Sequence, residues 1–241
     1  EYVIKANHLA DKINDPIVKI KILNKLAAHY QQLKIYEKAI AFLDESERMC
    51  LKYPVQDSVK FLLGNGYIIR GFIYKDQLNC EIAINYYLKG IKQYQGFDQN
   101  LVNPNSSIAH YNIGNCYTLM GNYALAKKSF NQSIDFAKKI NANSLEGFPL
   151  KGLAEVYTLE GNYKDAIDAL HSALLVSKSV GDLVLNLSIY KGLSENYLAI
   201  KEWEKYREYH LQYLKLHLEN KISQRQSISD SLVENQIASQ S

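Results

Sequence analysis

The sequence has few residues that break helices or cross-link chains. Its 241 residues include 4 prolines, 12 glycines, 3 cysteines and 1 tryptophan. The cysteines Cys50, Cys80 and Cys116 are scattered and odd in number, which argues against a disulfide framework and against a four-cysteine zinc site. No apolar run approaches the ~20 residues that a membrane-spanning helix requires, so we expect no membrane span in this segment.

An excess of charge of one sign is also lacking, because 28 Lys and Arg face 25 Asp and Glu, a net charge of +3. A nucleic-acid-binding surface needs basic residues clustered on one face, so we expect this segment to make no direct contact with nucleic acid. Hydrophobic residues make up 47% of the chain, which is typical of a globular protein. The chain begins at Glu1 without a signal peptide, so we expect a processed or excised piece, in the cytoplasm or the periplasm.

A repeat with a period of forty residues is present in the second half of the sequence. Its three strong copies share a tyrosine, at Tyr117, Tyr157 and Tyr197, and an aromatic residue six positions later, at Tyr123, Tyr163 and Trp203. Two weaker copies lie upstream, where Tyr74 precedes Tyr117 by 43 residues and Tyr30 precedes Tyr74 by 44. Ala10 and Ile13 fit the second half of a still earlier copy.

Each copy has the composition of two antiparallel helices joined by a short turn. Apolar residues recur every third or fourth position and no segment alternates as a strand does, so the predicted fold is all-α. Gly121 and Gly161 suit the turn, because glycine ends helices and tolerates positive φ. Small residues that allow close helix contact recur on the first helix, at Ala27, Gly114 and Ala154, and on the second, at Ala39, Ala126 and Ala166.

The copy around Tyr117 resembles the tetratricopeptide repeat. Residues 111–117 follow the consensus of its first helix, and Gly121, Tyr123, Ala126 and Phe130 continue the match into the second. The resemblance implies a right-handed superhelical solenoid of about five antiparallel helix pairs, with a leading half-pair and a C-terminal helix. It divides the chain into the second helix of a truncated repeat (1–15), the repeats (16–213), and the end of the last helix with a cap and a polar linker (214–241).

Two features depart from the tetratricopeptide pattern. The period is forty residues rather than thirty-four, so we expect longer helices or longer loops between repeats. The last copy carries Ser194 and Tyr206 where small residues stand in the other copies. Because these positions set the distance between paired helices, we expect the last pair to be either splayed or specialised.

The forty-residue form is similar to repeat regions of membrane-anchored sensor histidine kinases and AraC-type transcription regulators of the Bacteroidetes kind. In those families a membrane helix and an output domain follow the repeats. The resemblance implies a sensory or interaction region that holds a protein or peptide in its concave groove. Two alternatives remain open, namely a stand-alone assembly scaffold and the repeat domain of a cytoplasmic peptide-pheromone receptor.

Catalytic and metal-binding motifs are absent from the sequence. The Gly64-Asn65-Gly66 run lacks the third glycine of a nucleotide loop, and no zinc-protease helix or lipase elbow occurs. We therefore expect a non-enzymatic protein without cofactor or metal. Cys116 replaces a small core residue, whereas Cys80 stands in the place of the turn aromatic, where we expect it to be exposed.

The groove residues are inferred from the positions that face the groove in the tetratricopeptide family. The asparagines at these positions of the chain can hydrogen-bond to a peptide backbone or simply face water. The Lys–Glu pairs at these positions, spaced i,i+4, can present charges to a ligand or only stabilise their helices by ~0.2–0.5 kcal/mol. The predicted groove residues are Ile68, Phe72, Ile108, Tyr111, Asn112, Asn115, Phe148, Lys151, Glu155, Lys191 and Glu195.

Aromatic residues also crowd the last helix. Trp203, Tyr206, His210 and Tyr213 follow helical spacing and form one stripe. This stripe either packs against the preceding helix pair or docks a partner, since tryptophan and tyrosine are enriched in binding hot spots. A second copy of the chain is one such partner, which would make the protein a homodimer.

Overall fold

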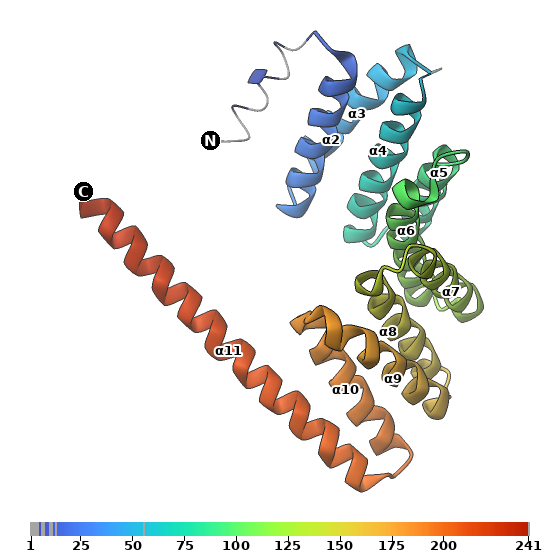
Figure 1. Cartoon of the computed structure of the whole chain (residues 1–241), viewed down its shortest axis with the longest axis vertical. Helices are drawn as coiled ribbons and strands as arrows, with labels where there is room; N and C mark the ends of the chain where they lie inside the picture. Colours follow the sequence, from blue (N-terminus) through green and yellow to red (C-terminus); the bar gives the residue numbers. More distant parts are fainter. Residues whose placement is uncertain (1–4, 6–7, 10–11, 13, 55, 241) are drawn as a thin grey trace. The chain divides into compact units, whose positions relative to one another are not determined.

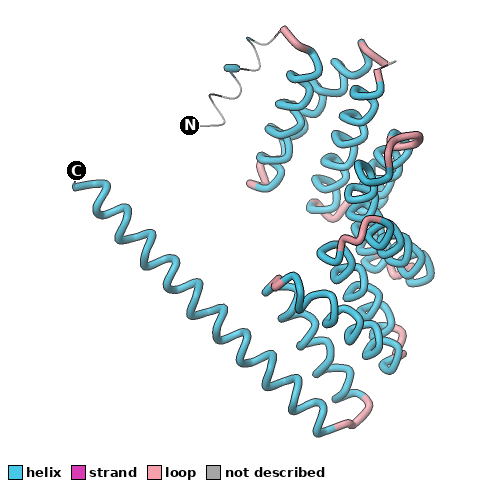
Figure 2. Tube along the Cα trace, in the orientation of Figure 1, coloured by secondary structure: helices cyan, strands magenta, loops and turns pink. Residues whose placement is uncertain are grey.

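The computed structural model describes residues 5, 8–9, 12, 14–54 and 56–240. Within these residues the chain contains helices and short connections only, as Figure 2 shows. The predicted all-α fold of paired helices is confirmed. Ala10 and Ile13, which mark the predicted leading half-repeat, lie outside the described residues.

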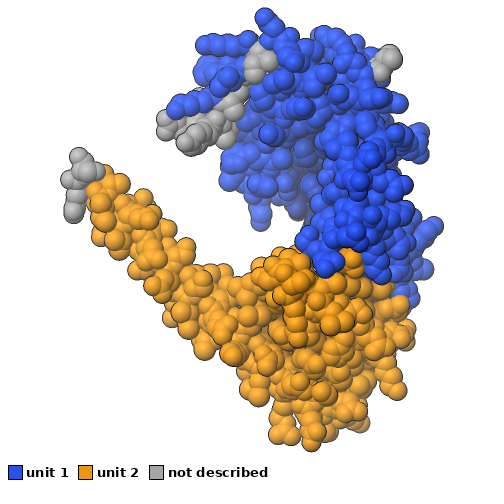
Figure 3. Space-filling model, viewed as in Figure 1, with its two compact units in different colours: residues 1–145 blue, residues 146–241 orange. Residues whose placement is uncertain are grey.

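The described helices form five consecutive pairs, each with a first and a second helix joined by a short turn (Figure 1). The chain divides into two compact units, Glu1–Leu145 and Glu146–Ser241 (Figure 3). The pairs are α2 (Pro16–Gln32) with α3 (Tyr36–Lys52), α4 (Asp57–Asp76) with α5 (Cys80–Gln93), α6 (Gln99–Leu119) with α7 (Tyr123–Lys139), α8 (Asn143–Leu159) with α9 (Tyr163–Val180), and α10 (Leu183–Ala199) with α11 (Trp203–Gln240).

The turn inside each pair depends on one residue in the left-handed region. Gly121 (φ 73°) and Gly161 (φ 77°) hold this position as predicted. The next N–H donates to the carbonyl of the repeat tyrosine, at 2.9 Å for Tyr117 and 2.8 Å for Tyr157, which closes the end of the first helix. The other three turns use the same geometry without glycine, at Lys34, Leu78 and Lys201.

The first unit is held together by close contacts between small and large residues. A Cβ atom on Gly114 would lie 2.6 Å from the ring of Phe130, so only glycine fits beside that phenylalanine. Gly71 faces Tyr87 in the same way one repeat earlier. Both aromatic side chains are fully buried, so the paired helices meet at a glycine with a large ring beside it.

The second unit has its own core, built from α8, α9 and α10. Ala154 and Leu170 lie in this core at the positions that Gly114 and Phe130 hold in the first unit. A larger residue on the first helix is therefore matched by a smaller one on the second. Tyr209 of α11 stacks on Tyr197 of α10 with ring centroids 5.5 Å apart, and this contact anchors the start of α11.

Helix α11 departs from the other second helices. It has 38 residues, and Figure 1 shows it leaving the side of α10. Forty residues earlier, α9 has the small buried residues Ala166 and Ala173 where α11 has the half-buried rings of Tyr206 and Tyr213. Over the range predicted to hold the end of the last helix, a cap and a polar linker, α11 continues through Gln240, since no glycine or proline follows Gly192. Residues 221–238 are all exposed.

Candidate functional site

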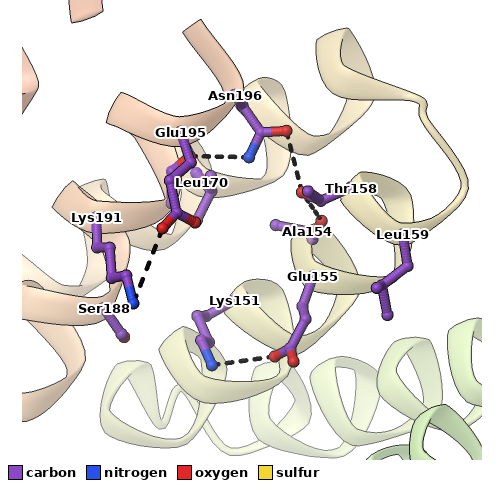
Figure 4. Close-up of a pocket in the computed structure, with 11 residues that line it drawn as sticks. Lys151, Ala154, Glu155, Thr158, Leu159, Leu170, Ser188, Lys191, Glu195 and Asn196 are labelled. Carbon is purple, nitrogen blue, oxygen red and sulfur yellow. Dashed lines mark hydrogen bonds and ion pairs between the residues drawn. The ribbon is translucent and has the colours of Figure 1, made fainter. Parts of the chain in front are cut away.

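A groove of about 410 Å³ lies between α8 and α10 in the second unit (Figure 4). Its apolar lining comes from Ala154 on α8, Leu170 on α9 and Gly192 on α10, and Leu159 lies at the end of α8. A volume of this size falls within the range of small-ligand sites in proteins. The remaining lining residues are polar, namely Lys151, Glu155, Thr158, Ser188, Lys191, Glu195 and Asn196.

Two Lys–Glu pairs line the groove, one on each first helix. Lys151 Nζ lies 3.1 Å from Glu155 Oε2 on α8, and Lys191 Nζ lies 3.8 Å from Glu195 Oε1 on α10. All four side chains are partly exposed. The lysine precedes the glutamate by one turn on both helices. We call Lys151 with Lys191 the lysine level of the groove and Glu155 with Glu195 its glutamate level. Four residues separate the two levels, which is about 6 Å along a helix axis.

Polar groups also reach the base of the groove. The Thr158 hydroxyl donates to Asn196 Oδ1 at 3.0 Å and to the Ala154 carbonyl at 2.9 Å, so that one hydrogen is shared between two acceptors. Asn196 Nδ2 donates to the Gly192 carbonyl at 2.8 Å. Asn196 is only 2% exposed, so these bonds fix its amide and stabilise a polar base between α8 and α10.

The structure brings four of the eleven predicted groove residues together, and these are the two Lys–Glu pairs. Phe148, also in the second unit, is half-buried against the core of α8, α9 and α10. In the first unit, Ile68 belongs to the core, where a Cβ atom on Gly90 would lie 2.8 Å from it. We expected Ile68 to face a groove, but the close approach of α5 covers it.

The asparagines and aromatic residues predicted for the groove of the first unit are used mainly within the fold. Asn112 is buried, accepts from Lys75 Nζ at 2.8 Å and donates to the Ile108 carbonyl at 2.8 Å. Its amide is therefore not free to bind a peptide backbone. Phe72 packs edge-on against Tyr87, Tyr111 packs against Phe130, and Ile108 and Asn115 are half-buried.

The predicted stripe on α11 is only partly covered. Trp203 is 56% exposed, and Tyr206, His210 and Tyr213 are half-buried. Tyr206 stacks on His210 with centroids 5.3 Å apart, so the rings cover one another along the helix. Tyr209, which is not part of the stripe, packs against Tyr190 and Tyr197 of α10 and against His171 of α9 in the preceding pair.

The cysteines lie in the interior. Cys80 is 8% exposed, so the expectation of an exposed thiol was wrong, because α5 begins against α4 and α6 rather than in solvent. Cys116 is fully buried, and burial raises the pKa of its thiol to about 12. Across the part of the chain that the structure describes, no three His, Cys, Asp or Glu side chains gather as metal ligands. No helix there combines the length and the apolar character of a membrane span.

Sequence reasoning missed several residues that line the groove, among them Leu170 and Asn196. Leu170 was not among the predicted groove residues, yet it forms part of the apolar lining. Asn196 was not considered, although it carried a signal, because Val156 and Cys116 hold the same position in the earlier repeats. An amide at a position that is otherwise apolar indicates a local polar partner, which here is Thr158.

Comparison with known proteins supports the same fold. Residues 107–139 match the family model of the tetratricopeptide repeat, and no curated protein is similar enough in sequence to indicate a relationship. BtubC (BKLC) from P. vanneervenii is similar in structure, with a TM-score of 0.76 and 15% identity over 91% of this chain and 88% of that one.

Two further solved structures are similar. Aspartyl phosphate phosphatase F from Bacillus subtilis has a TM-score of 0.71 and 16% identity over 85% of this chain, which spans 52% of that protein. A Rap protein complexed with Competence and Sporulation Factor has a TM-score of 0.60 and 14% identity, over 90% of this chain and 70% of the other. The chain therefore has the helical-repeat fold of these proteins, and residues 107–139 match a tetratricopeptide repeat.

Proposed function

We propose that this chain is a non-enzymatic module that binds a protein or peptide segment in the groove between α8 and α10. The observation that carries the proposal is the groove itself, which combines an apolar lining with one level of lysines and one of glutamates. A complex of a similar repeat protein with Competence and Sporulation Factor supports it. The groove lies on the first helices, where the tetratricopeptide resemblance predicts a ligand.

The two charge levels define the peptide that fits best. An extended strand advances about 6.6 Å for every two residues, and these two side chains point the same way. That spacing matches the distance of about 6 Å between the lysine level and the glutamate level. The groove therefore favours an extended peptide with one acidic and one basic side chain two residues apart. The acidic side chain would lie beside Lys151 and Lys191, and the basic one beside Glu155 and Glu195.

Short blocked peptides of the forms Asp-x-Lys, Asp-x-Asp and Lys-x-Lys test this preference. We expect the full chain to bind the Asp-x-Lys form at least tenfold more tightly, a difference of about 1.4 kcal/mol. The double variant Glu155→Lys with Glu195→Lys makes the groove wholly basic. It is expected to reverse the order and favour Asp-x-Asp. Fluorescence anisotropy at two salt concentrations measures both effects, and salt should weaken binding.

Glu208→Lys provides the matched control. Glu208 pairs with Lys205 at 3.1 Å on α11, outside the groove, so this variant makes the same kind of charge reversal, once instead of twice, in the same unit. Its peptide preference should equal that of the unmodified chain. Equal affinities of all three peptide forms, or a preference that the groove variant leaves unchanged, would contradict the proposal.

We further propose that the module is the sensory or interaction region of a bacterial signal-transduction or transcription-regulatory protein. The forty-residue repeat supports this context by resemblance. The sequence of the flanking gene separates it from the alternatives. A membrane helix with an output domain downstream supports the signalling protein, and an upstream DNA-binding helix-turn-helix supports a pheromone receptor. A reading frame that holds the repeats alone supports a scaffold.

The stripe on α11 suggests a second binding surface, for which we propose a second copy of the chain. In α9 the corresponding positions, forty residues earlier, are buried by α8 and α10. In α11 they carry large rings that are only half-buried. The equivalent residues in α9 and α11 are Ala166 and Tyr206, Leu170 and His210, Ala173 and Tyr213, and Ser177 and His217. The charges on α11 balance, with five Lys and Arg against five Asp and Glu, so a second α11 would meet no net repulsion.

Replacing Tyr206 and Tyr213 together by serine is expected to weaken self-association at least tenfold, because it removes two rings from the stripe. Sedimentation velocity over a concentration series measures the dimer dissociation constant. Leu175→Ser, at a 77% exposed site on α9, is the control and should leave self-association unchanged. A chain that stays monomeric at its highest soluble concentration would rule out the second copy as the occupant.

A further inference from the structure

Two of the three cysteines meet in the core of the first unit. Cys80 is the first residue of α5 and Cys116 lies near the end of α6, so they belong to consecutive helix pairs. Both are buried in one hydrophobic cluster, and burial together with the neighbouring Cys80 raises the pKa of the Cys116 thiol. Cys50 is also buried but lies in a different cluster, with Ile20, Val59 and Leu62.

The repeat register gives an independent reason for this contact. In the preceding pair, Tyr36 is the first residue of α3 and packs against the cluster that contains Ile73 of α4. Ile73 precedes the repeat tyrosine Tyr74, just as Cys116 precedes Tyr117. The starts of α3 and α5 thus meet the next first helix at equivalent positions. In this chain cysteine occupies both sides of that contact.

We propose that Cys80 and Cys116 are a redox-active pair that peroxide converts into a disulfide linking α5 to α6. The Cys80 thiolate attacks hydrogen peroxide, forming a sulfenic acid and displacing hydroxide, which leaves as water. The Cys116 sulfur then attacks the Cys80 sulfur, the S–S bond forms, and a second water leaves. Two thiols are oxidised and one peroxide is reduced, so no other reactant is needed.

Cys80 reacts first because it is the more exposed of the two thiols, at 8% against 0% for Cys116. Because both thiols are buried, the reaction follows local opening at the start of α5, so a low concentration of urea should accelerate it.

The test treats the full chain with hydrogen peroxide, then alkylates the remaining thiols in denaturant and maps the peptides without reduction. We expect one linked peptide pair that joins Cys80 to Cys116, a chain lighter by two hydrogen atoms, and one alkylated cysteine, Cys50. Since the cross-link closes a loop of more than thirty residues, the oxidised chain should melt several degrees higher than the reduced chain.

Cys50→Ser is the matched control, since it removes a buried thiol outside the pair and should leave the linked peptide unchanged. Cys80→Ser and Cys116→Ser should each abolish it, with circular dichroism showing whether each variant remains helical. Three alkylated cysteines after peroxide treatment would overturn the proposal. A link that involves Cys50 or joins two chains, or a sulfinic acid at Cys80 beside a free Cys116, would overturn it too.

Discussion

Replacing Phe130 by alanine is expected to lower the free energy of unfolding by about 3–5 kcal/mol. The side chain is fully buried and its ring fills the space beside Gly114, so the truncation leaves a cavity between α6 and α7 that glycine cannot fill. Urea unfolding followed by circular dichroism measures the loss. Leu125→Ala, on the same helix at a 38% exposed site, is the control and should cost about 1 kcal/mol or less.

The pairing of small and large residues adds a stricter test at the same place. Gly114→Ala alone should destabilise the chain, because its Cβ atom would lie 2.6 Å from the Phe130 ring. Combined with Phe130→Leu, it recreates the Ala154–Leu170 pair of the second unit. The double variant should therefore be more stable than the sum of the two single changes indicates. A loss below about 1 kcal/mol for Phe130→Ala, or strict additivity in the double variant, would contradict the packing described here.

The repeat predicted the helix pairs because its period records contacts that every copy makes. The tyrosines at 117 and 157 mark the carbonyls that close the first helix, and Gly121 and Gly161 follow at the left-handed position. The same position holds Leu78 in another copy, where local sequence gives no signal. There the tertiary contacts of the two helices impose a conformation that the residue itself disfavours.

The candidate site was predictable where it depended on spacing along one helix and less so where it depended on a neighbour. Lys151 and Lys191 are forty residues apart, so the repeat places them at equivalent positions of adjacent first helices, and both line the groove. Ile68 and Asn112 also follow the family pattern for groove positions. Their burial is set by the approach of α5 and by the reach of Lys75, and neither contact can be inferred from the pattern alone.

Acid is expected to destabilise the first unit through His110. The side chain is 8% exposed and stacks on Phe136 with ring centroids 5.3 Å apart. Burial lowers its pKa to about 4, from about 6.5 in an unfolded chain. Between these values the unfolded chain takes up a proton that the folded chain refuses, so stability falls as the pH drops from about 6.5 towards 4. The loss is at most about 3 kcal/mol, and urea unfolding at several pH values measures it.

His110→Phe keeps a ring against Phe136 and removes the titrating group. Carboxyl groups that titrate near pH 4 contribute to the acid response of both proteins, so the difference between the two curves isolates the histidine. The variant should lose less stability than the unmodified chain between pH 6.5 and 4, and the two curves should run parallel above pH 7, where both folded and unfolded His110 are neutral. Parallel curves over the whole range would mean that protonated His110 is accommodated in the folded state, in conflict with its burial and with the absence of a hydrogen-bond partner at Nδ1 among the described residues.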